Sequence, residues 1–143
     1  MYKKIFLALS IIVVFNSCSN SKKKSQKNQR SIKIEGVTLH KGKLWNANKE
    51  TTNGIKKMTE ILESFSQNNT IKPYKQLKEN LENVFVIIFS KCTMKGEAHK
   101  QLHNYLKPMI DYFNNLESED IKVREESFNK LKLHTLGYTN YFK

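Results

Sequence analysis

The side chains best suited to chemistry lie in one short stretch that holds a thiol, a thioether and two imidazoles. Cys92 and Met94 are followed by His99 and His103, which are four positions apart. On a helix this spacing puts both rings on one face with Cβ atoms about 6 Å apart, close enough to bind one metal ion. Sulfur and imidazole ligands together suit Cu(I) or Zn(II), and a methionine favours copper. The stretch therefore predicts a soft-metal site formed by these four side chains.

Two further residues can supplement this site or form a different one. Met58 and His134 are auxiliary ligands if the fold brings them near, although a methionine on an apolar helical face more often fills the core. The same two residues support a second hypothesis, haem binding. Their placement, a methionine on the first helix and a histidine near the end of the last, is similar to that of cytochrome b-type four-helix bundles. The sequence lacks a Cys-x-x-Cys-His attachment motif for a covalently bound haem.

Helical periodicity predicts the elements that must position these residues. From Trp45 onward, apolar residues recur at helical spacing, as at Ile55, Met58 and Leu62. Polar, turn-forming residues interrupt the pattern, and Ser118 is a suitable N-cap for the last helix. The helices are expected over residues 46–66, 72–92, 97–116 and 119–136.

Helices of similar length joined by short turns predict an all-α, up-down four-helix bundle. In that topology three segments share one end: the start of the first helix, the turn between the second and third, and the end of the fourth. Cys92, Met94, His99, His103 and His134 fall in these segments. The metal hypothesis therefore rests on a geometric expectation, that these side chains converge in one pocket.

The N-terminal residues have the order of a bacterial secretion signal. Two lysines precede an apolar stretch over residues 5–15, which is shorter than the roughly 20 residues that a membrane-spanning helix needs. The sequence FNSC, residues 15–18, resembles the lipobox of bacterial lipoproteins in the looser form of Bacteroidetes-type bacteria. The resemblance implies that residues 1–17 are a cleaved signal peptide and that Cys18 is lipidated.

A lipidated Cys18 implies attachment to the cell envelope, because two acyl chains anchor a protein stably where one is marginal. In lipoproteins of this kind, signals for export to the cell surface tend to be acidic after the cysteine, whereas residues 22–24 are lysines. The resemblance therefore implies the periplasmic face of the outer membrane. An ordinary secreted protein is the alternative. Lipidation would also leave Cys92 without a cysteine to pair with. In an oxidising compartment such a thiol is buried, bound to a metal, or used for redox or dimer chemistry, and the sequence leaves these alternatives open.

The excess positive charge lies in the segment that follows Cys18. The formal net charge is +12, with eight basic residues against one acidic over residues 18–44, but 15 basic against 12 acidic over residues 45–143. Residues 19–30 contain no aliphatic or aromatic side chain, so we expect a disordered basic tether, followed by a short extended arm on the domain. Each basic residue near anionic lipid contributes about 1 kcal/mol. Nucleic acid is not an expected partner, because a duplex binder carries its charge on the folded face.

The sequence thus predicts three parts: a signal peptide over residues 1–17, a lipidated cysteine and flexible basic tether over residues 18–44, and a helical bundle domain over residues 45–143. The main hypothesis is a membrane-anchored lipoprotein whose bundle sequesters or relays copper or zinc. The alternative is a cofactor-free lipoprotein that binds an envelope protein, as immunity-type lipoproteins do. We do not expect an enzyme, because no spacing identifies a nucleophile, a carboxylate pair or an oxyanion site.

Overall fold

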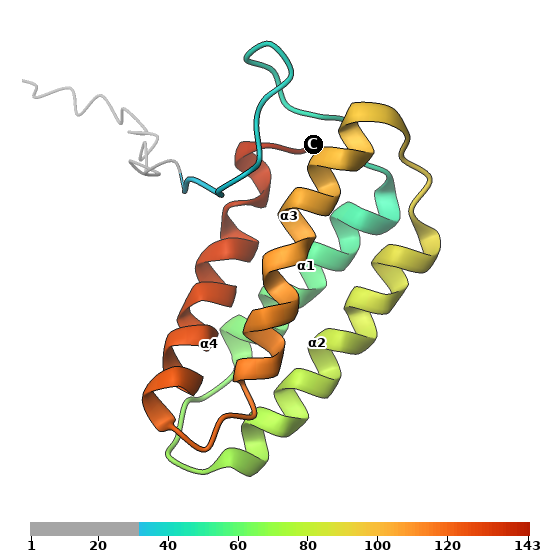
Figure 1. Cartoon of the computed structure of the whole chain (residues 1–143). Helices are drawn as coiled ribbons and strands as arrows, with labels where there is room; N and C mark the ends of the chain where they lie inside the picture. The colour runs from blue at the N-terminus through green and yellow to red at the C-terminus, as the bar shows by residue number, and fades with distance from the viewer. Residues whose placement is uncertain (1–31) are drawn as a thin grey trace, which may run out of the picture.

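The computed structural model describes residues 32–143, and these residues form an all-α fold (Figure 1). Each predicted helix is present, with ends that differ from the prediction by no more than three residues. The bounds are Lys49–Ser64 for α1, Ile71–Lys91 for α2, Gly96–Asn115 for α3 and Ile121–Leu136 for α4, followed by a short 3-10 helix, η1, at Tyr138–Asn140. The signal peptide, Cys18 and the first part of the tether lie outside the described residues.

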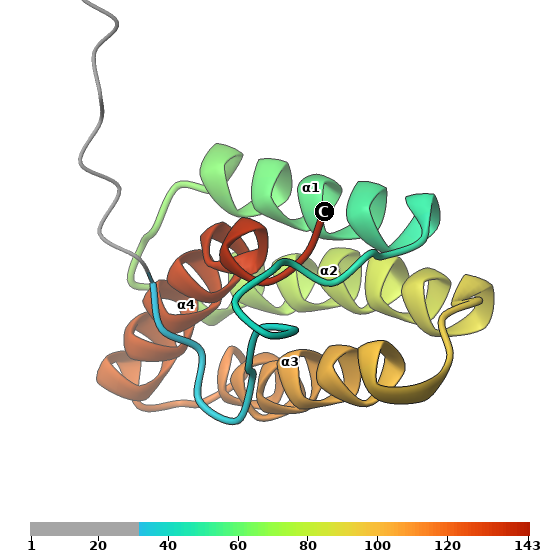
Figure 2. The ribbon, with the colours of Figure 1, turned by 90° about the horizontal axis from the view of Figure 1, so that it is seen from above.

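Consecutive helices run in opposite directions and form the expected up-down bundle (Figures 1 and 2). α1 packs against α2 and α4, and α3 packs against α4, whereas α2 and α3 approach each other less closely. Short turns join the helices, so the end of α2 and the start of α3 lie at the same end of the bundle (Figure 1). None of the helices within residues 32–143 is long and apolar enough to cross a membrane.

The apolar positions that predicted the helices form the core. Met58, Leu81, Leu106 and Phe113 are almost completely buried. α1 and α2 pack especially closely, since a Cβ added at Gly54 would overlap the side chain of Ile88. This close packing fixes the C-terminal half of α2, which leads directly into the predicted metal site.

The start of α4 differs from the prediction. Ser118 is the predicted N-cap, but α4 begins at Ile121, two residues later than predicted, and Asp120 caps it. The Asp120 carboxylate accepts a hydrogen bond from the backbone N–H of Lys122 at 2.8 Å, as an N-cap side chain does. Ser118 instead lies in the preceding turn, where its hydroxyl oxygen accepts from the Asp120 N–H at 3.2 Å. A carboxylate is the stronger acceptor at a helix N-terminus, which accounts for the shift.

The extended arm lies against the bundle, as expected, and belongs to the folded domain. Ile34 and Val37 are buried in the core, and the Ile34 N–H donates to the Tyr141 hydroxyl at 2.9 Å. Trp45 pairs with the C-terminal segment, because its backbone N–H donates to the Tyr141 carbonyl at 2.7 Å. The folded domain therefore includes residues 32–44, which the sequence assigned to the tether.

Candidate metal centre

The turn between α2 and α3 brings the predicted ligands together. Cys92 is the C-cap residue of α2, and its N–H donates to the Phe89 carbonyl at 3.4 Å. α3 begins at Gly96, whose φ of +60° lies in the left-handed region that glycine adopts without steric cost. The reversal of the chain is so short that His99, in the first turn of α3, lies beside Cys92.

Three of the four predicted ligands form a continuous row of contacts. The Cys92 Sγ lies 3.5 Å from the His99 Nδ1, and the His99 Nε2 lies 2.9 Å from the His103 Nε2. The two rings are 4.4 Å apart between centroids and inclined at 73°. The spacing of four residues therefore does bring both imidazoles to one face of α3, next to the thiol.

The row does not close around a single point. The Cys92 sulfur and the His103 ring contact different nitrogens of His99, and the lone pairs of those nitrogens point away from each other. Within residues 32–143, no group of three or more His, Cys, Asp and Glu side chains is arranged to hold a metal ion. The single pocket expected from topology is thus replaced by two donor pairs that share His99.

The site lies at the surface of the bundle end. Cys92, a free thiol, and His99 are half-buried, whereas His103 is exposed. The ring of Phe89 meets that of His103 edge to face, with centroids 5.6 Å apart. Asn48 reinforces this end, because its side-chain amide donates to the Lys91 carbonyl at 3.1 Å and so ties the start of α1 to the end of α2. Sequence reasoning missed both contacts.

The two methionines occupy different environments. Met94 is half-buried in the α2–α3 turn and packs against the hydrophobic core. Met58, predicted as an auxiliary ligand, is fully buried among core side chains. It has the position of a core-filling residue, which was the alternative interpretation of its sequence pattern.

His134 is buried between α3 and α4, and its position bears on the haem hypothesis. The His134 Nε2 lies 2.7 Å from the Tyr105 carbonyl oxygen, which can only accept, so Nε2 carries a proton. That nitrogen therefore has no lone pair to offer a metal. Burial lowers the pKa of His134 below its usual 6.5, an effect that the bond to Tyr105 partly offsets. As a neutral, buried hydrogen-bond donor, His134 suits a structural role in joining α4 to α3.

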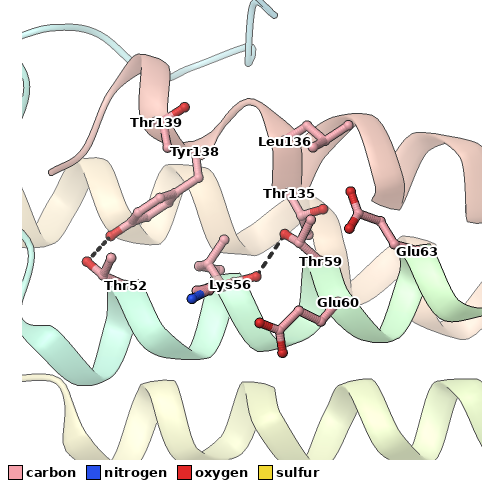
Figure 3. A pocket seen from close by; sticks show the side chains of 10 residues that line it. Thr52, Lys56, Thr59, Glu60, Glu63, Thr135, Leu136, Tyr138 and Thr139 are labelled. Carbon is pink, nitrogen blue, oxygen red and sulfur yellow. Dashed lines mark hydrogen bonds between the residues drawn. The ribbon is translucent and has the colours of Figure 1, made fainter.

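A groove of about 550 Å³ lies between α1 and α4, and no sequence pattern indicated it. Figure 3 shows its lining, in which the Tyr138 hydroxyl points toward Thr52; the two oxygens are 3.0 Å apart. The lining combines four threonines, one lysine and two glutamates with the apolar side chains of Ile55 and Leu136. The two hydroxyls hydrogen-bond to each other, and no side chain that lines the groove belongs to the Cys92–His99–His103 row.

Comparison of the chain with models of protein families, with curated proteins and with solved structures gave no match. The function must therefore be argued from the residues and their geometry. The arrangement with the clearest chemistry is the thiol–imidazole pair of Cys92 and His99, backed by the exposed ring of His103.

Proposed function

We propose that the bundle binds a soft transition-metal ion, Cu(I) or Zn(II), for sequestration or relay, with Cys92 and His99 as the primary ligands. The distance of 3.5 Å between Cys92 Sγ and His99 Nδ1 carries the proposal. A tetrahedral ion with a sulfur bond of about 2.3 Å and a nitrogen bond of about 2.0 Å separates its two donors by about 3.5 Å. The two side chains therefore suit a shared ion with little rearrangement. The same distance fits a thiol–imidazole hydrogen bond, so metal binding needs a direct test.

His103 acts in this proposal through His99 and not as a ligand to the same ion. A metal-binding histidine usually donates its other ring N–H to a neighbour, which fixes its tautomer and orientation. His103 Nε2, 2.9 Å from His99 Nε2, is well placed to accept that proton. The bond leaves the lone pair of His99 Nδ1 directed toward the thiol. His103, predicted as a ligand, is thus assigned as a positioning residue.

For Cu(I), Met94 is the third donor in this proposal. It follows Cys92 by two residues in the same turn and is half-buried. A thioether binds Cu(I) far better than Zn(II), so participation of Met94 would direct the site toward copper. Met94→Leu, which keeps the apolar bulk, should lower the affinity for Cu(I) by about 10-fold or more and leave zinc binding nearly unchanged.

The proposed place of action is the periplasmic face of the outer membrane, with the chain anchored through a lipidated Cys18. The resemblance of residues 15–18 to a lipobox and the basic residues that follow support this part of the proposal. Mass spectrometry of the chain purified from bacterial membranes should find a diacylated N-terminal Cys18. The Cys18→Ser variant should lose the lipid. An unmodified Cys18 would refute the anchor without bearing on metal binding.

The metal proposal is tested with the full-length chain in detergent under reducing conditions. Cu(I) and Zn(II) are titrated against chromophoric chelators of known affinity. We expect Cys92→Ser and His99→Gln to weaken binding by at least about 100-fold, and His103→Gln by about 10–100-fold, the range seen for outer-shell partners. His40→Gln is the matched control, because His40 is an exposed histidine of the arm.

Unchanged binding in Cys92→Ser would refute the site. If the unmodified chain binds neither ion, the proposal falls as a whole. The alternative of a cofactor-free lipoprotein that recognises an envelope protein would then stand.

A further inference from the structure

The proposed metal site is short of ligands within one chain. Cys92 and His99 supply two donors, whereas a structural zinc site takes four protein ligands in a tetrahedral arrangement. Within residues 32–143, no third Cys, His, Asp or Glu joins this pair at one point. The missing donors must come from the solvent, from a methionine or from another molecule.

An exposed apolar surface borders the same site. We call it the α2–α3 patch, and its members are Val86, Phe89 and Ile110, with exposed fractions of 63%, 43% and 45%. Val86 and Phe89 are three positions apart on α2 and so share a face. Phe89 touches the ring of His103, and Ile110 lies on the His103 face of α3, seven positions along. Through Phe89 and His103 the patch therefore borders the row that holds His99.

We propose that a second copy of this chain docks on the α2–α3 patch and that the two copies together complete the metal site. The inference rests on the proposed function, because it assigns the missing ligands of the same ion. In a two-fold dimer, each copy presents the same surface to the other. Two copies of Cys92 and His99 then supply two sulfurs and two nitrogens, a tetrahedral set typical of zinc.

The number and type of the donors favour a second copy over an unrelated partner. One chain supplies half of a Cys₂His₂ set, and a two-fold axis doubles that half without requiring any new residue. The same axis lets the patches of the two copies cover each other. Burial of apolar side chains at the edge of a metal site excludes water and strengthens the charged interactions within it.

The test is native mass spectrometry of the full-length chain released from detergent micelles, kept reduced so that no disulfide forms. Without metal, the chain should be a monomer. With ZnCl₂ alone as the probe, it should become a dimer that carries one zinc ion per two chains. Cys92→Ser should abolish the zinc-dependent dimer.

Two matched variants on α2 test the patch. Phe89→Glu should weaken the zinc-dependent dimer by at least about 10-fold, because it puts a charge into the buried interface. Ile87→Glu is the control: Ile87 is 53% exposed but lies on the opposite side of the helix from Phe89, so dimerisation should not change. Circular dichroism verifies that both variants keep their helices.

The outcomes separate the two proposals. One zinc ion bound to a monomer would overturn the dimer and leave the proposed function standing. Failure to bind zinc would overturn the dimer, and failure to bind both zinc and Cu(I) would overturn the proposed function as well. A dimer that forms without zinc, or that persists in Cys92→Ser, would overturn the inference that the second copy completes the site. Equal weakening by Phe89→Glu and Ile87→Glu would overturn the assignment of the patch.

Discussion

Arg124 joins two turns at the end of the bundle opposite the metal site, and its replacement gives a prediction whose size the structure sets. The side chain is 2% exposed. One guanidinium nitrogen, Nη1, donates to the Ser118 carbonyl at 2.7 Å, and the other, Nη2, donates to the Asn69 carbonyl at 3.1 Å. The guanidinium carbon also lies 5.0 Å from the centroid of the Tyr74 ring. Arg124 therefore links the α1–α2 turn to the α3–α4 turn.

Arg124→Lys keeps the charge but loses the planar fork that reaches both carbonyls. Loss of one charged hydrogen bond costs about 1.5–3 kcal/mol, and loss of the cation–π contact costs about 1 kcal/mol more. We expect the free energy of unfolding to fall by about 2–4 kcal/mol, which lowers the melting temperature by roughly 10–20 °C in a domain of this size. Thermal and urea unfolding followed by circular dichroism measure both quantities.

The control lies on the same helix. Lys130 forms an ion pair with Glu126 at 2.7 Å, but both side chains are more than half exposed. Lys130→Gln should therefore change the free energy of unfolding by less than about 0.5 kcal/mol. If Arg124→Lys were as mild as this control, the two carbonyl contacts would not be holding the turns together.

The remaining predictions concern packing, capping and protonation. Gly54→Ala places a Cβ against buried Ile88 and should cost about 1–3 kcal/mol in urea unfolding, despite a gain in helix propensity; an unchanged midpoint would contradict the close contact of α1 and α2. Asp120→Ala removes the N-cap of α4 and should cost about 1 kcal/mol, measured by thermal unfolding, whereas Asp120→Asn should be nearly neutral. Burial lowers the pKa of His134, so the unfolded chain binds a proton that the folded ring resists: stability is full above pH 6.5 and falls as the pH drops from there through the lowered folded pKa. In His134→Gln, which keeps a donor for the Tyr105 carbonyl, urea midpoints measured across that range should lose this pH dependence; an identical decline would exclude His134 as its source.

The helices could be predicted from the sequence because their apolar residues recur every three or four positions. Residues at this spacing lie on one side of a helix, where they can be buried together. The contact of Cys92, His99 and His103 could be predicted for a similar local reason. The spacing of four positions places the two rings on the same face of α3. Because the turn between α2 and α3 is short, Cys92 at the end of α2 must lie close to the start of α3.

Other features depend on contacts between residues far apart in the chain. Ile34 packs into the core, and its N–H donates to the hydroxyl of Tyr141, 107 positions away; no local pattern indicates such a partner. Nor does spacing say which ring nitrogen of His99 faces the thiol, since that depends on side-chain torsions. The predicted single pocket required the thiol and the His103 ring to meet the same nitrogen of His99, and in the structure they meet different nitrogens. Met58 and His134 likewise have apolar surroundings that only the packed helices define.

X-ray absorption spectroscopy of the metal-loaded full-length chain tests the central claim most directly. For the zinc-loaded chain, we predict sulfur scattering at about 2.3 Å together with nitrogen from imidazole at about 2.0 Å, and loss of the sulfur shell in Cys92→Ser. A spectrum with only oxygen and nitrogen around the zinc, unchanged by that substitution, would contradict the account.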